Sequence, residues 1–263
     1  MSTVPEFAVS GFQVEWVAET GSTNADLLAA ARRGAGANRV LVADFQRAGR
    51  GRRGRTWEAA PGSSLLFSVL IRPELPVEAA HLVTTALALS AAEACDSRAG
   101  VRPGLKWPND LVVADRKLAG VLAESLVAGD GLEAVVAGMG LNVKAGAAPS
   151  VVSGSATAGS AVALEDVCGS VVDRRGLLEE ILGRLAHWMG RIETADGQAA
   201  LLAAARRESA TLGRRVSVAL SDGSVCEGLA QDLDERGALL LEGGIRVVVG
   251  DVVHLRDATR EQD

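Results

Sequence analysis

The sequence has few aromatic residues and no excess of positive charge. Its 263 residues include four Trp, four Phe and no Tyr, and the formal net charge is −6. Proteins that bind nucleic acid present basic surfaces, and those that bind single strands add aromatic side chains on which bases stack. The composition therefore disfavours nucleic-acid binding by the chain as a whole, while a local basic patch stays compatible with it.

Cysteine and histidine are also scarce. Cys95, Cys168 and Cys226 are far apart and form no C-x-x-C pair, which argues against a disulfide framework or a zinc site. The three histidines are scattered, and their spacing fits neither a metal site nor a Ser-His-Asp triad. We therefore expect reduced thiols, no metal site built by protein side chains, and no covalent enzyme intermediate.

The chain has no long hydrophobic run. Its first twenty residues carry three glutamates and no basic start, so a secretory signal is not expected. The longest uncharged stretch, residues 145–164, contains Gly, Ser and Pro in place of Leu and Ile, which predicts a loop and not a membrane span. We therefore expect a cytoplasmic protein that does not bind membranes.

Residues up to about 210 alternate between helical and extended patterns, which predicts a mixed α/β domain. Strands are predicted at 40–45, 64–71, 111–113, 117–124 and 134–143, and helices at 25–33, 77–95, 174–192 and 197–208. The last three strands follow one another without an intervening helix, which implies antiparallel pairing.

The composition changes near Leu212. From there to Leu255, short β-branched runs alternate with glycine-containing turn signals, which predicts five short strands in a small closed barrel. The predicted organisation is a short N-terminal segment at 1–13, a large domain at 14–210, a barrel at 211–258 and a tail at 259–263.

The strongest local feature is a loop with four arginines and three glycines at residues 48–55, directly after a predicted strand. Glycine lets the backbone come close to a ligand, and guanidinium groups bind phosphate or carboxylate oxygens in pairs. A solvated basic loop or an RNA-binding tract of the RGG kind is the alternative. On this loop alone, the anion-substrate and nucleic-acid hypotheses are about equally supported.

Three further segments contain candidate site residues, each a weak signal by itself. Lys106-Trp107-Pro108-Asn109-Asp110 is a turn before a strand, and Lys117 begins an apolar strand that ends at Glu124. Gly138 and Gly140 share one face of the next strand, where they would let a ligand or a backbone segment lie close.

Taken together, in this order and spacing, these segments resemble the biotin protein ligase family. The resemblance also includes Gly21-Ser22-Thr23-Asn24, Gln46 and Trp57, and it extends from about Val14 to Leu255. It implies a core like that of class II aminoacyl-tRNA synthetases, with a mixed, largely antiparallel sheet and flanking helices, followed by a small SH3-like barrel. It also implies that ATP activates biotin to biotinyl-5'-AMP, which is transferred to a lysine of a biotin carboxyl carrier domain.

The resemblance also assigns roles to individual residues. Those implied to bind biotin are Ser22, Thr23, Asn24, Gln46, Arg50, Gly51, Arg52 and Lys117. Those implied to bind the nucleotide are Arg52, Arg55, Trp57, Asn109, Lys117 and Asn142. The implied catalytic residues are Lys117, which would contact the biotin carboxylate and the α-phosphate, Arg52, and Asp110, which would orient the incoming amine.

Magnesium is expected from the chemistry, mainly bound to ATP and pyrophosphate, since the sequence has no compact carboxylate cluster. About a dozen residues precede the core, too few for the winged helix-turn-helix domain that some members of the family carry. Residues 212–263 have six Arg against ten Asp and Glu, so we expect no DNA binding. A homodimer is compatible with the family, but the sequence does not decide it.

Two alternatives stay open. A lipoate or octanoate ligase or transferase has a related fold, but a long acyl chain would need a deep apolar tunnel and no polar set that matches a ureido ring. A nucleic-acid-binding module built on the arginine loop is the more distant alternative, because the chain is acidic and poor in aromatic residues.

Overall fold

The structure is a computed structural model that describes residues 6–129, 131–147, 161–220 and 222–255. Residues 1–5 of the predicted N-terminal segment, the predicted tail at 259–263 and most of the predicted loop at 145–164 lie outside the described residues.

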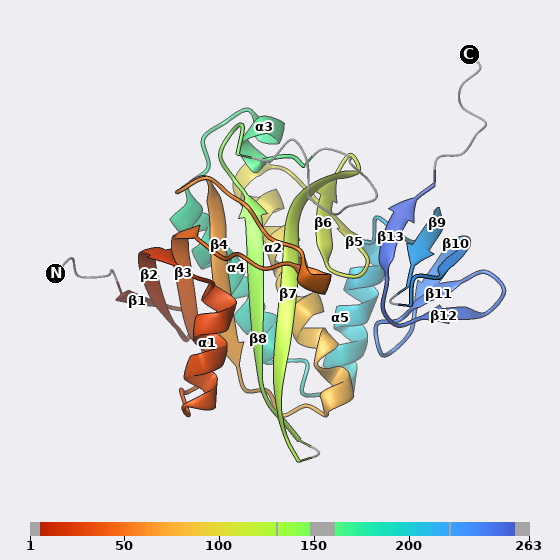
Figure 1. Ribbon diagram of the computed structural model, residues 1–263, viewed down its shortest axis with the longest axis horizontal. Helices are drawn as coiled ribbons and strands as arrows, with labels where there is room; N and C mark the ends of the chain where they lie inside the picture. The colour runs from red at the N-terminus through yellow and green to blue at the C-terminus, as the bar shows by residue number, and fades with distance from the viewer. Residues whose placement is uncertain (1–5, 130, 148–160, 221, 256–263) are drawn as a thin grey trace.

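An eight-stranded sheet forms the centre of the larger part of the molecule (Figure 1). Its strands are β1 (Glu6–Val9), β2 (Phe12–Thr20), β3 (Arg39–Gln46), β4 (Ser64–Ile71), β5 (Gly104–Lys106), β6 (Asp110–Val113), β7 (Arg116–Ala128) and β8 (Gly131–Asn142). Their spatial order is β1-β2-β3-β4-β8-β7-β6-β5. Only the β2–β3 pair is parallel among the named neighbours in this sheet. The prediction of a mixed, largely antiparallel sheet is confirmed.

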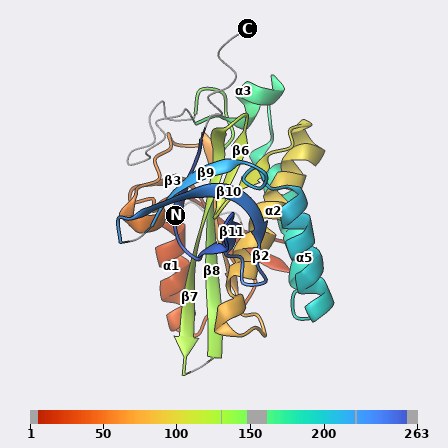
Figure 2. The ribbon, with the colours of Figure 1, turned by 90° about the vertical axis from the view of Figure 1, so that its right-hand side faces the viewer.

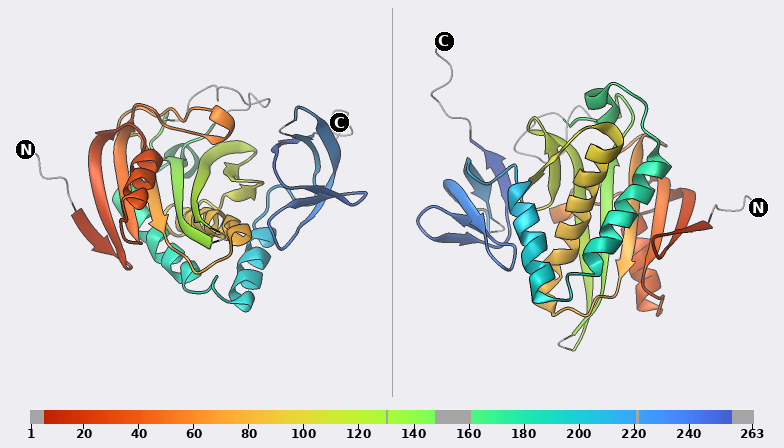
Figure 3. Two further views of the ribbon diagram at one scale, coloured as in Figure 1. Left: turned by 60° about the horizontal axis from the view of Figure 1, so that its bottom comes forward. Right: turned by 180° about the vertical axis from the view of Figure 1, so that it is seen from behind.

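Helices cover both faces of this sheet. Helix α1 (Thr23–Arg32) lies on one face, and α2 (His81–Ala99), α4 (Arg174–Met189) and α5 (Ala195–Arg207) lie on the other, as the view from behind shows (Figure 3). Every residue of β4 is therefore buried, which explains why this strand is a nearly continuous apolar run without polar alternation. The short helix α3 (Leu164–Cys168) lies between β8 and α4 in the chain.

A second, five-stranded antiparallel sheet lies beside the β5 edge of the first (Figure 1) and is turned toward the viewer in Figure 2. It consists of β9 (Arg215–Ala219), β10 (Val225–Leu233), β11 (Leu239–Leu241), β12 (Ile245–Val247) and β13 (Asp251–His254). The spatial order is β12-β11-β10-β9-β13, and all of its neighbouring pairs are antiparallel. The prediction of a separate small β structure at the C-terminus is confirmed.

Trp107 connects the two parts. It lies between β5 and β6, yet its side chain packs in the core of the small sheet with residues such as Val216, Val218 and Leu239. Its indole N–H donates to the carbonyl of Gly237 at 2.9 Å. This contact holds the small sheet against the turn that carries Asn109 and Asp110.

Several boundaries differ from the sequence prediction; helix α4, for example, ends at Met189 and not at residue 192. Helix α2 begins at His81 and not at Val77, because Val77–Ala79 form a short 3-10 turn after Pro76. The N-terminal segment contains a strand, β1, which pairs with β2. In the described part of the chain, no helix has the length and apolar character that crossing a membrane requires.

Candidate active site

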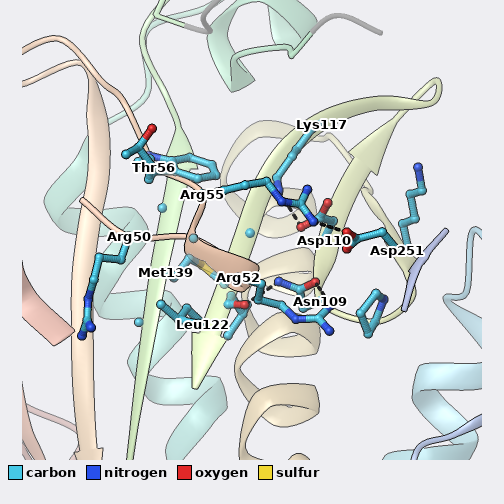
Figure 4. Close-up of a pocket in the computed structure, with 18 of the residues that line it drawn as sticks. Arg50, Arg52, Arg55, Thr56, Asn109, Asp110, Lys117, Leu122, Met139 and Asp251 are labelled. Atoms are coloured by element: carbon cyan, nitrogen blue, oxygen red, sulfur yellow. Dashed lines mark hydrogen bonds and ion pairs between the residues drawn. The ribbon is translucent and has the colours of Figure 1, made fainter. Parts of the chain in front are cut away.

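A cavity of about 290 Å³ lies where the two parts of the molecule meet (Figure 4). One wall is the surface of β7 and β8 beside the N-terminus of α1, and another is the Gly/Arg loop between β3 and β4. The turn between β5 and β6 and residues of β9 and β13 complete it. The cavity therefore combines segments that are far apart in the sequence.

Hydrogen-bonding side chains are gathered at one end of the cavity, where α1 begins. Thr23 and Asn24 are 3% and 4% exposed, and Ser68 on β4 is fully buried beneath them. The backbone N–H of Thr23 donates to Oε1 of Gln46 at 2.8 Å. Buried polar groups are costly unless they are hydrogen-bonded, so this end of the cavity is a fixed polar arrangement.

The two glycines of β8 make room for two site residues. A Cβ atom at Gly138 would overlap the side-chain amide of Asn24, and one at Gly140 would overlap the indole ring of Trp57. Gly49 has the same function in the loop, since a Cβ there would overlap the carbonyl oxygen of Trp57. Gly138 and Gly140 therefore allow close approach, as predicted, and the groups that approach them are the side chains of Asn24 and Trp57.

Lys117 lies at the other end of the cavity. Its ammonium group is 2.7 Å from Oδ1 of Asp110 and 5.5 Å from the centroid of the Trp57 ring. Gly120 lies opposite, and a Cβ there would be 3.1 Å from Nζ of Lys117. Lys117 is thus held between a carboxylate and an aromatic face, an arrangement that fixes a point charge beside the cavity.

Three arginines of the Gly/Arg loop bind three different partners. Arg50 donates to Glu124 at 2.7 Å, Arg52 donates to Asn109 at 3.0 Å, and Arg55 is ion-paired with Asp251 on β13. Figure 4 shows Arg50 pointing away from the other two guanidinium groups. The loop is therefore anchored both to the large sheet and to the small one.

Asp251 also accepts from Arg53, at 3.2 Å. Burial acts to raise the pKa of Asp251, but the hydrogen bond from Arg55 and the charges of Arg55, Arg52 and Arg53 outweigh it and lower that pKa. Burial lowers the pKa of Arg52, although Asp251 and Asp110 oppose this effect. The carboxylate of Asp251 is therefore held in its charged form by the loop.

A second ionic contact joins the two sheets at Asp115, in the turn between β6 and β7. Arg214 donates to both carboxylate oxygens, at 2.6 and 3.0 Å, and His254 lies 3.1 Å away. The hydrogen bond from Arg214 lowers the pKa of Asp115 to about 2. Burial, together with the charges of Lys106 and Arg214, lowers the pKa of His254.

Of the site residues named from the sequence, all but one line this cavity: Ser22, Thr23, Asn24, Gln46, Arg50, Gly51, Arg52, Arg55, Trp57, Asn109, Asp110 and Lys117. The exception, Asn142, is 1% exposed, and its amide donates to the carbonyl of Val162 at 3.3 Å. Its position favours a structural role over the predicted contact with a nucleotide.

Ser68, Lys106, Asp115 and Asp251 also line the cavity, although no role was assigned to them from the sequence. Lys106 belongs to the quoted Lys-Trp-Pro-Asn-Asp segment, so its place beside Asp110 was a usable signal. Ser68 is one of two serines in an otherwise apolar, buried strand, a weaker signal of the same kind. Asp115 and Asp251 have no local signal, because only the docking of the small sheet brings them to the cavity.

Among the described residues, no three His, Cys, Asp or Glu side chains are grouped closely enough to hold a metal ion. The carboxylates at the cavity are already paired with cations: Asp110 with Lys117, Asp115 with Arg214, and Asp251 with Arg55. The described side chains therefore do not fit a resident metal ion.

Two family models match the chain. The first is the biotin/lipoate A/B protein ligase family, over residues 22–142, and the second is the biotin protein ligase C-terminal domain, over residues 211–255. Both matched regions contribute residues to the cavity.

Relatives match over nearly the whole chain. A biotin–[acetyl-CoA-carboxylase] ligase of Mycobacterium tuberculosis is 40% identical, over 93% of this chain and 90% of the relative. One from Paracoccus denitrificans is 32% identical, over 86% of this chain and 93% of the relative. Among solved structures, the biotin protein ligase of Aquifex aeolicus in complex with biotin and ATP matches with a TM-score of 0.76 and 26% identity, over 93% of this chain and 99% of that one.

Proposed function

Because this chain belongs to the biotin protein ligase family, we propose that it activates biotin with ATP and transfers it to a lysine of a biotin carboxyl carrier domain. In the first step, a carboxylate oxygen of biotin attacks the α-phosphorus of ATP and pyrophosphate leaves, which gives biotinyl-5'-AMP. In the second, the acceptor amine attacks the acyl carbon, the bond from that carbon to the phosphate oxygen breaks, and AMP leaves.

The observation that best supports this proposal is the distribution of polarity along one cavity. The end at Thr23 and Gln46 is uncharged and hydrogen-bonding, whereas the end at Lys117 and Arg55 is cationic. Leu122, which pairs with Gly138 on the face of the sheet that borders the cavity, and the ring of Trp57 over Gly140 supply apolar surface. The polar end of the cavity suits a ureido ring, the apolar surface suits an aliphatic chain, and the cationic end suits a carboxylate that meets a phosphate.

We assign Lys117 to the first step. Its ammonium group would stabilise the negative charge that grows on the α-phosphate, and groups aimed at such developing charge supply a large share of catalysis. In the structure described here, Asp110 holds this ammonium group in place at 2.7 Å. Arg52 and Arg55 would bind phosphate oxygens in place of their present partners, Asn109 and Asp251.

We assign Asp110 to the second step. An acceptor ammonium group must lose a proton before it attacks, and a carboxylate within hydrogen-bond reach can hold it and take that proton. Asp110 lies on the cavity wall at the start of β6, at the end where the acyl phosphate would form. Trp57, beside Lys117, is the residue that we assign to the adenine ring.

Magnesium enters the proposal only with the nucleotide. It would screen the charge of the triphosphate and would be bound by phosphate oxygens, because the carboxylates at the cavity are paired with cations. We assign no magnesium ligand among the described residues.

We also propose a cytoplasmic location and no DNA-binding role, the latter because residues 212–263 carry six Arg against ten Asp and Glu. The division into a catalytic domain at 14–210 and a small domain at 211–258 belongs to the same proposal. Homodimerisation stays a prediction, which sedimentation of the purified protein would test.

Transfer is tested with a purified biotin carboxyl carrier domain, ATP and biotin, by measuring the mass of the acceptor. The proposal predicts the addition of one biotin, and no addition to a control acceptor whose target lysine is replaced by arginine. Addition of biotin to the arginine control, or to neither of the two acceptors, would contradict the assigned transfer step. Modification by lipoate or octanoate in place of biotin would favour the related acyl ligases.

A further inference from the structure

Ser68 and Glu124 belong to one chain of hydrogen bonds that also includes Thr23 and Asn24. The chain begins at Thr23, passes through Ser68 and Asn24, and ends at Glu124, which also accepts from Arg50. It links α1, β4, β7 and the Gly/Arg loop. Its members are buried or nearly so at the Thr23 end and partly exposed at Glu124.

Two backbone groups determine the direction of this chain. The side chain of Asn24 meets the carbonyl oxygen of Leu122 at 3.1 Å, and a carbonyl can only accept, so the atom facing it must be the Nδ2 donor. The Oδ1 atom of Asn24 therefore faces Ser68, at 2.6 Å, and an amide oxygen can only accept. The hydroxyl proton of Ser68 is thus committed to Asn24.

The same reasoning applies to Thr23 and Gln46. Thr23 Oγ1 lies 2.7 Å from the Ser68 hydroxyl, whose own proton is already used, and 3.1 Å from Oε1 of Gln46, which can only accept. The single hydroxyl proton of Thr23 can serve one of these two acceptors, and we assign it to the shorter contact, with Ser68. The backbone N–H of Thr23 can only donate, so the atom of Gln46 that faces it is Oε1. Toward the cavity, Thr23 is left with an acceptor and Gln46 with its Nε2 donor.

We propose that Ser68 and Glu124 are positioning residues that fix which hydrogen-bonding groups the head-group site offers, an acceptor at Thr23 and a donor at Gln46. This inference rests on the proposed function, in which the ureido ring binds beside these two residues. An acceptor next to a donor is the complement of an N–H next to a C=O, as in a ureido group. A dithiolane ring or an alkyl chain would leave both groups unpaired, which is a strong basis for rejection.

Glu124 completes the arrangement. Its Oε2 atom accepts from Asn24 at 3.0 Å and from Arg50 at 2.7 Å. With Leu122, it uses both amide protons of Asn24, so the amide cannot rotate without losing several hydrogen bonds. The carboxylate thereby couples the orientation of Asn24 to the position of Arg50 in the loop.

The first test replaces Ser68 by alanine and measures the biotin dissociation constant by calorimetry. Losing one hydrogen bond of an ordered site predicts a roughly three- to tenfold weaker affinity. In pyrophosphate exchange, KM for biotin should rise by a similar factor, while KM for ATP and kcat at saturating biotin stay near the wild-type values. A merely structural role would not separate the two substrates in this way.

Ser64→Ala is the matched control. Ser64 lies on the same strand and is equally buried, and its hydroxyl has no hydrogen-bond partner among the described residues. Its replacement should leave biotin affinity unchanged. Thermal melts of both variants identify any general loss of folding.

A double-mutant cycle tests the mechanism itself. Thr23→Val removes the acceptor that Ser68 is proposed to orient, so Ser68→Ala should weaken biotin binding little further in that background. In a separate pair, Glu124→Gln keeps an oxygen acceptor for Asn24 and should weaken binding less than Glu124→Leu. This pair keeps the inference testable even if Ser68→Ala does not fold.

The outcomes separate the inference from the function on which it rests. The inference would be overturned if Ser68→Ala bound biotin with wild-type affinity. It would also be overturned if Ser68→Ala weakened biotin binding by the same factor with and without Thr23→Val, which would show that the two residues act independently. The ligase assignment would stand in both cases. Equal losses of biotin affinity in Glu124→Gln and Glu124→Leu would show that Glu124 has no part in the proposed positioning. A wild-type protein that binds no biotin would instead overturn the proposed function.

Discussion

Replacing Gly140 by alanine should weaken ATP binding through Trp57 and through no other contact. Gly140 lies within β8, so alanine introduces no unfavourable backbone conformation. The new Cβ would overlap the indole ring and would lie 2.6 Å from Nε1 and 2.8 Å from Cδ2. Ordinary contacts between such atoms need about 3.5 Å or more, so the ring must move by roughly 1 Å.

The size of the effect follows from the role assigned to Trp57. Stacking of a base on an aromatic side chain contributes about 1–3 kcal/mol, which corresponds to about a five- to 150-fold change in affinity. A shifted ring loses part or all of this contribution, and Lys117 also loses its aromatic neighbour at 5.5 Å. We therefore expect KM for ATP to rise within that range, while KM for biotin stays nearly constant.

Pyrophosphate exchange at varied ATP and at varied biotin measures both constants. Gly131→Ala is the matched control, since it lies on the same strand and its Cβ would be 3.6 Å from the nearest atom, a normal contact. Gly138→Ala, which displaces Asn24, should show the opposite pattern and raise KM for biotin. A folded Gly140→Ala protein with wild-type KM for ATP would refute the role assigned to Trp57.

Three further predictions concern Lys117, Asp251 and His254. Lys117→Ala should slow adenylate formation in single-turnover experiments by about 100- to 1000-fold. The melting temperature should change little, because the ion pair of Lys117 with Asp110 is partly exposed. A folded variant with near-normal adenylation would remove Lys117 from the mechanism. Asp251→Asn should speed trypsin cleavage within the Gly/Arg loop, because Arg53 and Arg55 lose their anchor, and unchanged cleavage would show that the contact does not restrain the loop. The lowered pKa of His254 means that the unfolded chain binds a proton more readily, so the free energy of unfolding should fall as the pH drops below about 6.5. Urea denaturation at a series of pH values measures this free energy, which should depend less steeply on pH in His254→Gln than in the wild type. An equal dependence on pH in the two proteins would contradict the argument.

The fold class was predictable from local signals, whereas most of the residues that line the cavity were named through the resemblance to the biotin protein ligase family. Three antiparallel strands were recognisable from apolar runs without intervening helices, and β6, β7 and β8 confirm that pairing. The Gly/Arg loop follows β3 directly, so the pattern also placed its arginines near the end of a buried strand. Gly138 and Gly140 were correctly interpreted as positions of close approach, although the groups that approach are the side chains of Asn24 and Trp57 and not the predicted ligand or backbone segment.

Other features depend on contacts between distant segments. Nothing around Asp251 marks it as part of a site, since the docking of the small sheet, through Trp107 and several ion pairs, brings β13 to the cavity. Ser68 is one of two serines in an otherwise apolar strand, and its partners Thr23 and Asn24 are more than 40 positions away. A pattern in the sequence can indicate that a glycine leaves room, but it does not identify Trp57 as the group that fills it.

The central claim is that the cavity activates biotin. Its most direct test is the exchange of labelled pyrophosphate into ATP by the purified protein, with biotin, lipoate, octanoate or no acid. The account predicts exchange with biotin alone, because the polar end of the cavity, at Thr23 and Gln46, matches a ureido ring. Exchange with lipoate or octanoate in place of biotin, or no exchange with any acid, would contradict it.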